Sequence, residues 1–162
     1  MNSAGNLLYA ANGKTGAIDE FNGSFEQQTT SGFVDPGLPT GYVPFNVEDM
    51  GGKVYVTYAL AGGPPAQDGA LAGQGAIAVF DESGTFIQQL VGVMPTGTGE
   101  LASPWGMAIA PAGFGRFGGD LLVGNFSAAL SEINAFDPTT GVFNGPIQVN
   151  PGAGDTAEAF GT

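Results

Sequence analysis

The stretch FDPTTG at residues 136–141 decides the fold of this chain, because two related stretches precede it. FDESG occupies residues 80–84, and FNG occupies residues 21–23. Each contains a phenylalanine, then Asp or Asn, and then a glycine that suits a tight turn. The three phenylalanines lie 59 and 56 residues apart, so the spacing indicates an internal repeat.

The turn chemistry predicts that each phenylalanine ends one strand of a hairpin. Asn22–Gly23 is a favoured pair for a two-residue turn, because both central positions need positive φ. Asp81 and Asp137 can accept hydrogen bonds from backbone N–H groups nearby, while Gly84 and Gly141 suit the left-handed position. We therefore expect these aspartates to form turns rather than to bind a metal or act in catalysis.

The residues around the turns repeat as well. An alternating apolar run opens each repeat, with equivalent positions at Leu8, Val54 and Leu122. An Ile-x-x-Phe pattern follows, beginning at Ile18, Ile77 and Ile133. After the turn a second phenylalanine resumes the strand pattern, at Phe25, Phe86 and Phe143. These matches predict equivalent units built from antiparallel strands.

A further strand precedes the second and third repeats. Residues 42–56 match residues 103–123, anchored on Pro44–Phe45 and Pro104–Trp105. The complete unit then has four strands, and units of four strands repeating about every 45 to 50 residues are typical of a β-propeller. A sandwich of seven or eight strands fits the strand count but does not predict the repeat.

We therefore expect an all-β fold, a partial β-propeller of about three four-stranded antiparallel blades. Residues 1–162 form one domain, with a blade remnant at 7–28, blades at 42–90 and 103–148, and the start of the next at 155–162. Closed propellers have four to eight blades. The sequence thus predicts a fragment of a longer, six-bladed propeller, or a chain completed by another copy.

The composition excludes several classes of function. Fifteen acidic residues face three basic ones, for a net charge of −12. That balance opposes binding to nucleic acid, which needs clustered Lys or Arg. No apolar run approaches the roughly 20 residues that span a bilayer, so membrane insertion is not expected. The sequence has no Cys and no His, which removes the commonest nucleophile–base pairs.

PWGMAIAPAGFGRFGGDLLVGNF at 104–126 and INAFDPTTGVFNG at 133–145 carry a resemblance to known proteins. The chain resembles uncharacterised exported bacterial β-propellers with NHL-like repeats, some of which end in a surface-sorting tail. The resemblance implies an extracellular or periplasmic bacterial protein without an assigned activity. The chain shows no signal peptide and no sorting tail, a difference that favours a fragment.

Long loops are expected to share one face of the propeller, at 29–41, 60–75 and 91–102. Aromatic and amide side chains at nearby strand ends can stack on and hydrogen-bond a glycan or a protein ligand. The candidate ligand-binding residues are Asn12, Tyr42, Tyr58, Trp105 and Asn125. In the alternative interpretation, Tyr42 and Trp105 only fill gaps between blades, and the segment 60–75 is a flexible insertion.

A metal site is the second possibility. Asn46, Asp120 and Asn125 offer oxygen ligands of the kind that calcium takes, and no other cofactor is suggested. The sequence favours a non-enzymatic binding module, with a calcium-dependent hydrolase or lyase of the six-bladed type as the alternative. A passive spacer that binds nothing is the third hypothesis.

Overall fold

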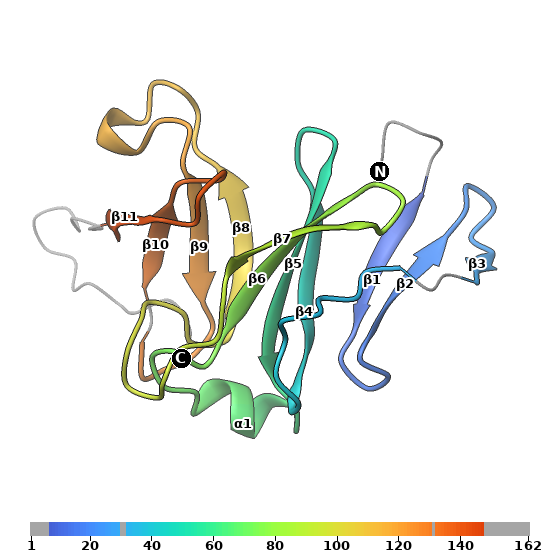
Figure 1. Ribbon diagram of the computed structural model, residues 1–162, viewed down its shortest axis with the longest axis horizontal. Coiled ribbons are helices and arrows are strands. Elements are labelled where there is room, and N and C mark those ends of the chain that lie inside the picture. The colour runs from blue at the N-terminus through green and yellow to red at the C-terminus, as the bar shows by residue number, and fades with distance from the viewer. Residues whose placement is uncertain (1–6, 30–31, 131, 148–162) are drawn as a thin grey trace, which may run out of the picture.

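The computed structural model describes residues 7–29, 32–130 and 132–147. Its elements form an all-β fold of three antiparallel sheets, which stack side by side (Figure 1). Sheet 1 contains β1 (Leu8–Asn12), β2 (Ala17–Phe21) and β3 (Gln27–Gln28). Sheet 2 contains β4 (Tyr42–Asp49), β5 (Lys53–Leu60), β6 (Ala76–Asp81) and β7 (Phe86–Val91). Sheet 3 contains β8 (Pro104–Ile109), β9 (Leu121–Asn125), β10 (Ile133–Phe136) and β11 (Phe143–Pro146).

Helix is nearly absent from these residues. The helix α1 (Pro64–Asp68) has five residues and begins with two prolines, whose fixed φ suits the first turn of a helix. A 3₁₀ turn, η1, covers Gly115–Phe117. Among the described helices, none is long and apolar enough to cross a membrane.

Each sheet is a meander, in which strands that follow one another in the chain are neighbours in the sheet. The strand order confirms four-stranded units at 42–91 and 104–146, preceded by a three-stranded one. The predicted strand at 155–162 lies outside the described residues.

The pairing register explains why phenylalanine recurs. Phe21 pairs with Leu8, Phe80 with Val54, and Phe136 with Leu121. The three phenylalanines therefore hold the same place, at the end of the third strand of a unit and opposite the start of the second. The alignment of Leu122 with Leu8 and Val54 was wrong by one residue, because Leu121 is the partner of Phe136. In a strand, that one-residue shift exchanges the two faces.

The turns after these phenylalanines are held by the residue that follows each of them. The side chain of Asp81 accepts hydrogen bonds from the N–H groups of Ser83 and Thr85, at 2.8 and 2.9 Å. The Asn22 side chain accepts the equivalent bonds from Ser24 and Glu26. The two-residue turn predicted at Asn22–Gly23 is therefore wrong, since the backbone N–H of Asn22 bonds to the carbonyl of Glu26.

The third turn is one residue longer and uses the same device. Asp137 accepts hydrogen bonds from the N–H groups of Thr139 and Thr140, both at 2.8 Å. Phe86 and Phe143 resume the strands, as expected, opposite Phe80 and Phe136. Phe25 does not, because it lies in the turn with φ of 61° and 79% of its surface exposed. Gln27 is the residue that pairs with Phe21.

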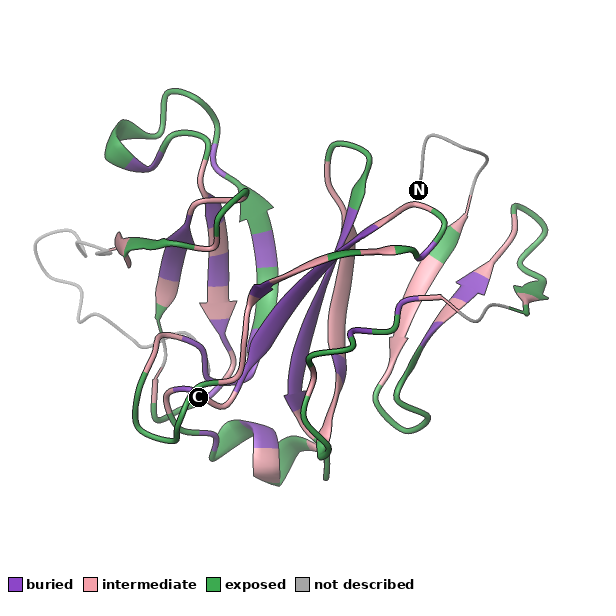
Figure 2. Cartoon of the chain, viewed as in Figure 1, coloured by how far each residue is buried: buried purple, intermediate pink, exposed green. Residues whose placement is uncertain are grey.

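The core consists of two layers, one on each face of sheet 2. The layer towards sheet 1 includes Ile18, Val54, Val56 and Phe80. The layer towards sheet 3 includes Tyr55, Ile77, Val79, Leu121 and Phe136. Successive residues of β5 and β6 thus enter opposite layers, as the alternation of a strand requires. Figure 2 shows the result, since β5 and β6 are buried along most of their length.

Candidate functional site

The five residues predicted to bind a ligand lie at the same end of the sheets, here called the rim. Tyr42 opens β4 opposite Leu60, and Pro104, beside Trp105, pairs with Asn125. Asn12, Tyr58 and Asn125 hold equivalent positions, four residues beyond Leu8, Val54 and Leu121 in their strands. In Figure 1 the rim is the lower end, where α1 and the long connection between β7 and β8 lie.

Two β-bulges place aromatic side chains at the rim. The pairing of β4 with β5 shifts between Pro44 and Asn46, and that of β8 with β9 shifts between Pro104 and Met107. Phe45 and Trp105 are therefore bulge residues that each follow a proline, as the matched Pro-aromatic pairs suggested. A bulge bends its strand and re-aims the side chain that it carries.

Phe45, Trp105 and Phe126 form an aromatic cluster between sheets 2 and 3. The ring centroid of Phe126 lies 5.6 Å from that of Phe45 and 6.0 Å from that of Trp105, both nearly edge to face. The Asn46 amide donates a 2.8 Å hydrogen bond to the carbonyl oxygen of Trp105. That bond joins the first strands of the two sheets, so the cluster has a fixed position.

A pocket of about 370 Å³, the rim pocket, opens beside this cluster. Its lining consists of Trp105, Gly106, Gly124, Asn125, Phe126, Glu132 and Ile133. Trp105 is 53% exposed, an unusual state for so large an apolar side chain. The two glycines leave a floor without side chains, and a Cβ built on Gly106 would touch nothing within 4 Å. An apolar ring can therefore lie against Trp105 without obstruction from the floor.

The loops at the rim, among them residues 60–75, are bound to one another by hydrogen bonds. The N–H groups of Met94, Gly97 and Ser103 donate to the carbonyls of Gly73, Ala72 and Gln74. The Ser127 hydroxyl and the Ala128 N–H both donate to the carbonyl of Asp68. The connections 60–75 and 91–103 and the segment 126–130 are thus joined to one another by hydrogen bonds.

Asn125 holds part of that surface in place. Its side-chain oxygen accepts a 3.0 Å hydrogen bond from Ala102 N–H, and its amide donates at 2.9 Å to the carbonyl of Glu100. Only 6% of Asn125 is exposed. The amide of Asn125 is thus committed to the loop, and the residue positions the wall of the rim pocket.

Asn12 is likewise engaged by its own turn. Its side-chain oxygen accepts bonds from the N–H groups of Lys14 and Thr15, and its amide donates to Asp19 at 2.9 Å. Tyr42 is half-buried and packs against the layer between sheets 1 and 2, where burial raises its pKa. Of the five predicted residues, Trp105 and Asn125 line the rim pocket, and Trp105 is much the more exposed of the two.

Tyr58 has a different environment from the one expected. It is 2% exposed, and its hydroxyl has no hydrogen-bond partner among the described residues. Burial raises the pKa of Tyr58 strongly, and the negative charge of Asp35 raises it further. A side chain so deeply buried supports the core and does not contact a ligand at the surface.

The three predicted calcium ligands do not converge. Asp120 precedes β9 and Asn125 ends it, so about five residues of strand, roughly 16 Å, separate them. Asp120 accepts a 3.0 Å bond from the Asn144 amide, and both polar atoms of the Asn46 side chain are engaged within sheets 2 and 3. Across the described ranges, no group of three Asp or Glu side chains is placed to hold a metal ion.

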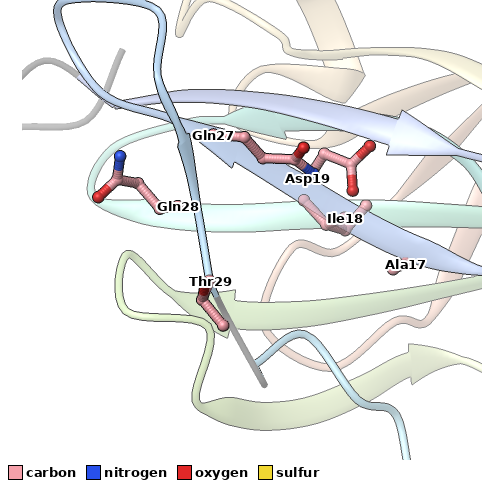
Figure 3. Close-up of a pocket in the computed structure, with 6 residues that line it drawn as sticks. All are labelled: Ala17, Ile18, Asp19, Gln27, Gln28 and Thr29. Atoms are coloured by element: carbon pink, nitrogen blue, oxygen red, sulfur yellow. The ribbon is translucent and has the colours of Figure 1, made fainter.

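Two further pockets were not anticipated from the sequence. One, of about 340 Å³, lies on sheet 1 and is lined by Ala17, Ile18, Asp19, Gln27, Gln28 and Thr29 (Figure 3). In that view Gln27 and Asp19 lie next to each other, while Gln28 points away. The other, of about 240 Å³, lies between sheets 2 and 3 and is lined largely by glycines and apolar residues, with Glu100. The sequence feature that could have indicated the pocket on sheet 1 was the pair of glutamines after the first turn.

Comparisons with known proteins correct the expected relationship. No family model matches the chain, and no solved structure matches it. Uncharacterized protein R648 of Acanthamoeba polyphaga mimivirus is 34% identical over 149 residues, which cover 89% of this chain and 35% of that protein. Uncharacterized protein L690 of the same virus is 34% identical over 150 residues, covering 89% and 38%.

The predicted resemblance to exported bacterial propellers with NHL-like repeats was therefore wrong, because the similar proteins are viral. The chain spans little more than a third of the length of these curated relatives.

Proposed function

We propose that the three sheets are consecutive blades of a β-propeller, of the six-bladed type expected from the repeat. Three observations support the arrangement: equivalent register in each unit, meander order within each sheet, and stacking of one sheet on the next. The Asn46–Trp105 bond also brings the first strands of sheets 2 and 3 together, as blades arranged about an axis require.

We further propose that the protein is a non-enzymatic binding module whose rim pocket takes a glycan. The observation that carries this proposal is the exposed Trp105 ring, held out by a bulge beside a glycine floor. Aromatic rings stack on the apolar face of a sugar, and the carboxylate of Glu132 can accept hydrogen bonds from hydroxyl groups. A net charge of −12 disfavours anionic ligands.

A protein ligand remains the other occupant of this surface, and the test below distinguishes the two. The calcium-dependent hydrolase or lyase has no observation in its favour, because its proposed ligands lie apart. An extracellular or periplasmic location stays a prediction; the resemblance on which it rested has been overturned.

The test is a glycan array probed with the whole chain and with Trp105→Ala. We expect binding to a set of neutral glycans that the variant weakens by about fivefold or more, since stacking contributes about 1 kcal/mol or more of binding energy. Phe114→Ala is the matched control, because Phe114 is also an exposed aromatic residue, 43% accessible, but lies in the loop between β8 and β9 at the other end. Equal glycan binding by both variants would contradict the site, and capture of a protein instead of glycans would contradict the ligand class.

A further inference from the structure

The turn between β2 and β3 contains Asn22–Gly23–Ser24, an Asn-x-Ser triplet of the kind to which a glycan is attached through the asparagine. Such an acceptor asparagine belongs on a surface loop. Residues 23–27 are all exposed, and the Asn22 amide donates a 2.8 Å hydrogen bond to the exposed carboxylate of Glu26. The triplet therefore lies in the structural setting that the modification requires.

The equivalent turns show that the turn itself does not need the amide nitrogen of Asn22. Asp81 and Asp137 hold the same position in the other two sheets, and each supports its turn with carboxylate oxygen. In the first turn the side-chain oxygen of Asn22 accepts the corresponding bonds from the N–H groups of Ser24 and Glu26. A glycan is attached to the nitrogen and leaves that oxygen unchanged. The turn can therefore be glycosylated without losing the bonds that hold it.

The Ser24 hydroxyl, which the triplet requires, also lies at the surface. In the second turn the equivalent hydroxyl, that of Ser83, donates a 2.6 Å hydrogen bond to the carboxylate of Asp81. Ser24 instead bonds to Asn22 through its backbone N–H, at 2.9 Å. The acceptor amide and the hydroxyl that a transferase recognises are thus presented together on one turn.

Phe25 supplies a second, independent observation. Its ring is 79% exposed, and its φ of 61° is costly for a residue other than glycine. Backbone strain of this kind clusters at functional sites. The Phe25 N–H donates to the carbonyl of Asn22, so the ring and the Asn22 amide leave the same turn. An aromatic ring in that place can pack against the apolar face of a sugar attached to the amide.

We propose that Asn22 carries an N-linked glycan whose first sugar packs on Phe25. The donor is a sugar activated on a lipid pyrophosphate, and a cellular transferase catalyses the transfer. Nδ2 of Asn22 attacks the anomeric carbon, the C–N bond forms as the C–O bond breaks, the lipid pyrophosphate leaves, and Nδ2 loses one proton to solvent. Nδ2 keeps its second proton for the bond to Glu26. Since the triplet is used in secreted proteins, the inference is consistent with the predicted extracellular location and independent of the rim pocket.

A second triplet of the same type, Asn125–Phe126–Ser127, is closed to modification by the fold. Asn125 is 6% exposed and Ser127 is fully buried. The Asn125 amide donates to the carbonyl of Glu100, and the Ser127 hydroxyl donates to the carbonyl of Ala70. A glycan at Asn125 would break these bonds, so this triplet is an internal control.

The experiment isolates the whole chain from the cells that naturally make it and analyses its peptides by mass spectrometry. We expect a glycan on Asn22 that peptide N-glycosidase removes, and none on Asn125. Ser24→Ala, expressed in the same cells, should lose the glycan, whereas Ser24→Thr should keep it, because threonine also carries the hydroxyl. An unmodified Asn22, its conversion to aspartate without a sugar, or equal modification of Asn125 would each overturn the inference.

The contact with Phe25 has its own test, the effect of Phe25→Gly on stability with and without the glycan. Without the glycan, in the Ser24→Ala background, relief of backbone strain should raise the ratio of folded to unfolded protein by about fivefold. With the glycan this gain should disappear, because the ring then has a sugar to pack against. An equal gain in both forms would overturn the contact between the sugar and Phe25.

Discussion

Phe25 occupies, in the turn between β2 and β3, the backbone position that Gly84 occupies in the turn between β6 and β7. Both residues have positive φ, 61° for Phe25 and 81° for Gly84. Each donates its backbone N–H to the carbonyl three residues earlier, Phe25 to Asn22 and Gly84 to Asp81. The first turn therefore places a phenylalanine where the second places the residue best suited to the conformation.

Phe25→Gly should stabilise the protein. An L-residue other than glycine in the left-handed region costs about 1–2 kcal/mol, and the exposed Phe25 ring offers little packing to offset it. We expect the free energy of unfolding in urea to rise by about 1 kcal/mol. Gly84→Ala is the matched opposite change and should lower it, because a Cβ there would lie 3.0 Å from the Phe33 ring. A destabilised Phe25→Gly variant would show that the ring has a packing role.

Gly141→Ala should be among the most destabilising small substitutions. Gly141 has φ of 71°, and a Cβ at this position would overlap the carbonyl oxygen of Leu90. We expect a loss of about 2–4 kcal/mol in the free energy of unfolding, by left-handed strain and overpacking together. Gly97→Ala is the control, since Gly97 has φ of 87° but open space around it, and should lose only about 1 kcal/mol. Equal losses would mean that the contact with Leu90 carries no cost.

Asn125→Ala should loosen the rim loops. The change leaves the buried Ala102 N–H without its acceptor and removes one of two amides bonded to the carbonyl of Glu100. We expect a loss of about 1–3 kcal/mol and faster hydrogen exchange at Ala102. Asn144→Ala, which removes an exposed bond to Asp120 on the same sheet, should change stability by less than about 0.5 kcal/mol. Unchanged exchange at Ala102 would show that Asn125 does not hold the loop.

Tyr58→Phe should leave stability unchanged or raise it by about 1 kcal/mol, because the buried hydroxyl has no partner among the described residues. The pKa of Tyr58 is raised in the folded protein, so its contribution is complete below the ordinary value of 10 and is lost at more alkaline pH. The variant should therefore resist alkaline unfolding better than the parent, as measured by urea titrations. A clear loss of stability at neutral pH would instead reveal a bound water or ligand at the hydroxyl.

Acid should weaken the hairpin turns. The Ser83 hydroxyl and the N–H groups of Ser83 and Thr85 lower the pKa of Asp81, and the N–H groups of Thr140 and Thr139 lower that of Asp137. Groups with lowered folded-state pKa values stabilise the protein above the ordinary value of 3.8, and that contribution disappears as pH falls through the folded value. Stability should thus fall below about pH 4, and less steeply in Asp81→Asn/Asp137→Asn. If the free energy of unfolding fell equally steeply with pH in parent and variant, these two carboxylates would not be the cause of the acid sensitivity.

The sequence was sufficient to predict the all-β class and the four-stranded unit. Phe80 and Phe136 hold equivalent positions because turn chemistry and strand alternation are both local, and both are visible in single residues. The match of Pro44–Phe45 with Pro104–Trp105 was informative for the same reason. In both strands a proline directly precedes the aromatic residue of the bulge, and this order is visible in the chain.

The pairing register of the strands was harder to predict from the sequence. Leu121 and Leu122 are adjacent leucines, and nothing in the sequence says which of them pairs with Phe136. Phe25 was misread because its identity suggested a strand, whereas its place after Asn22 made it a turn residue. In both cases the deciding interaction was a backbone hydrogen bond, which side-chain patterns do not record.

The strand order was sufficient to predict that the candidate residues share one end of the sheets, but not what surrounds each side chain. The strand ends correctly placed Asn12, Tyr58 and Asn125 at one rim, yet burial decides what such side chains do there. Tyr58 is buried in the core, and the side chain of Asn125 is hydrogen-bonded to the loop at residues 100–102. The bulge at Trp105, by contrast, leaves that side chain exposed to solvent. Asp120 was grouped with Asn125 on residue type alone, and the direction of β9 separates them.

Because β5 and β6 are covered on both sides, removing either end sheet would expose side chains of β5 and β6 that are now buried. Loss of sheet 3 by a protease cut would expose Tyr55, Ile77 and Val79 together. They would form a continuous apolar, aggregation-prone surface at the centre of what remains. The molecule should therefore melt as one cooperative unit, and it should survive in a cell either whole or not at all.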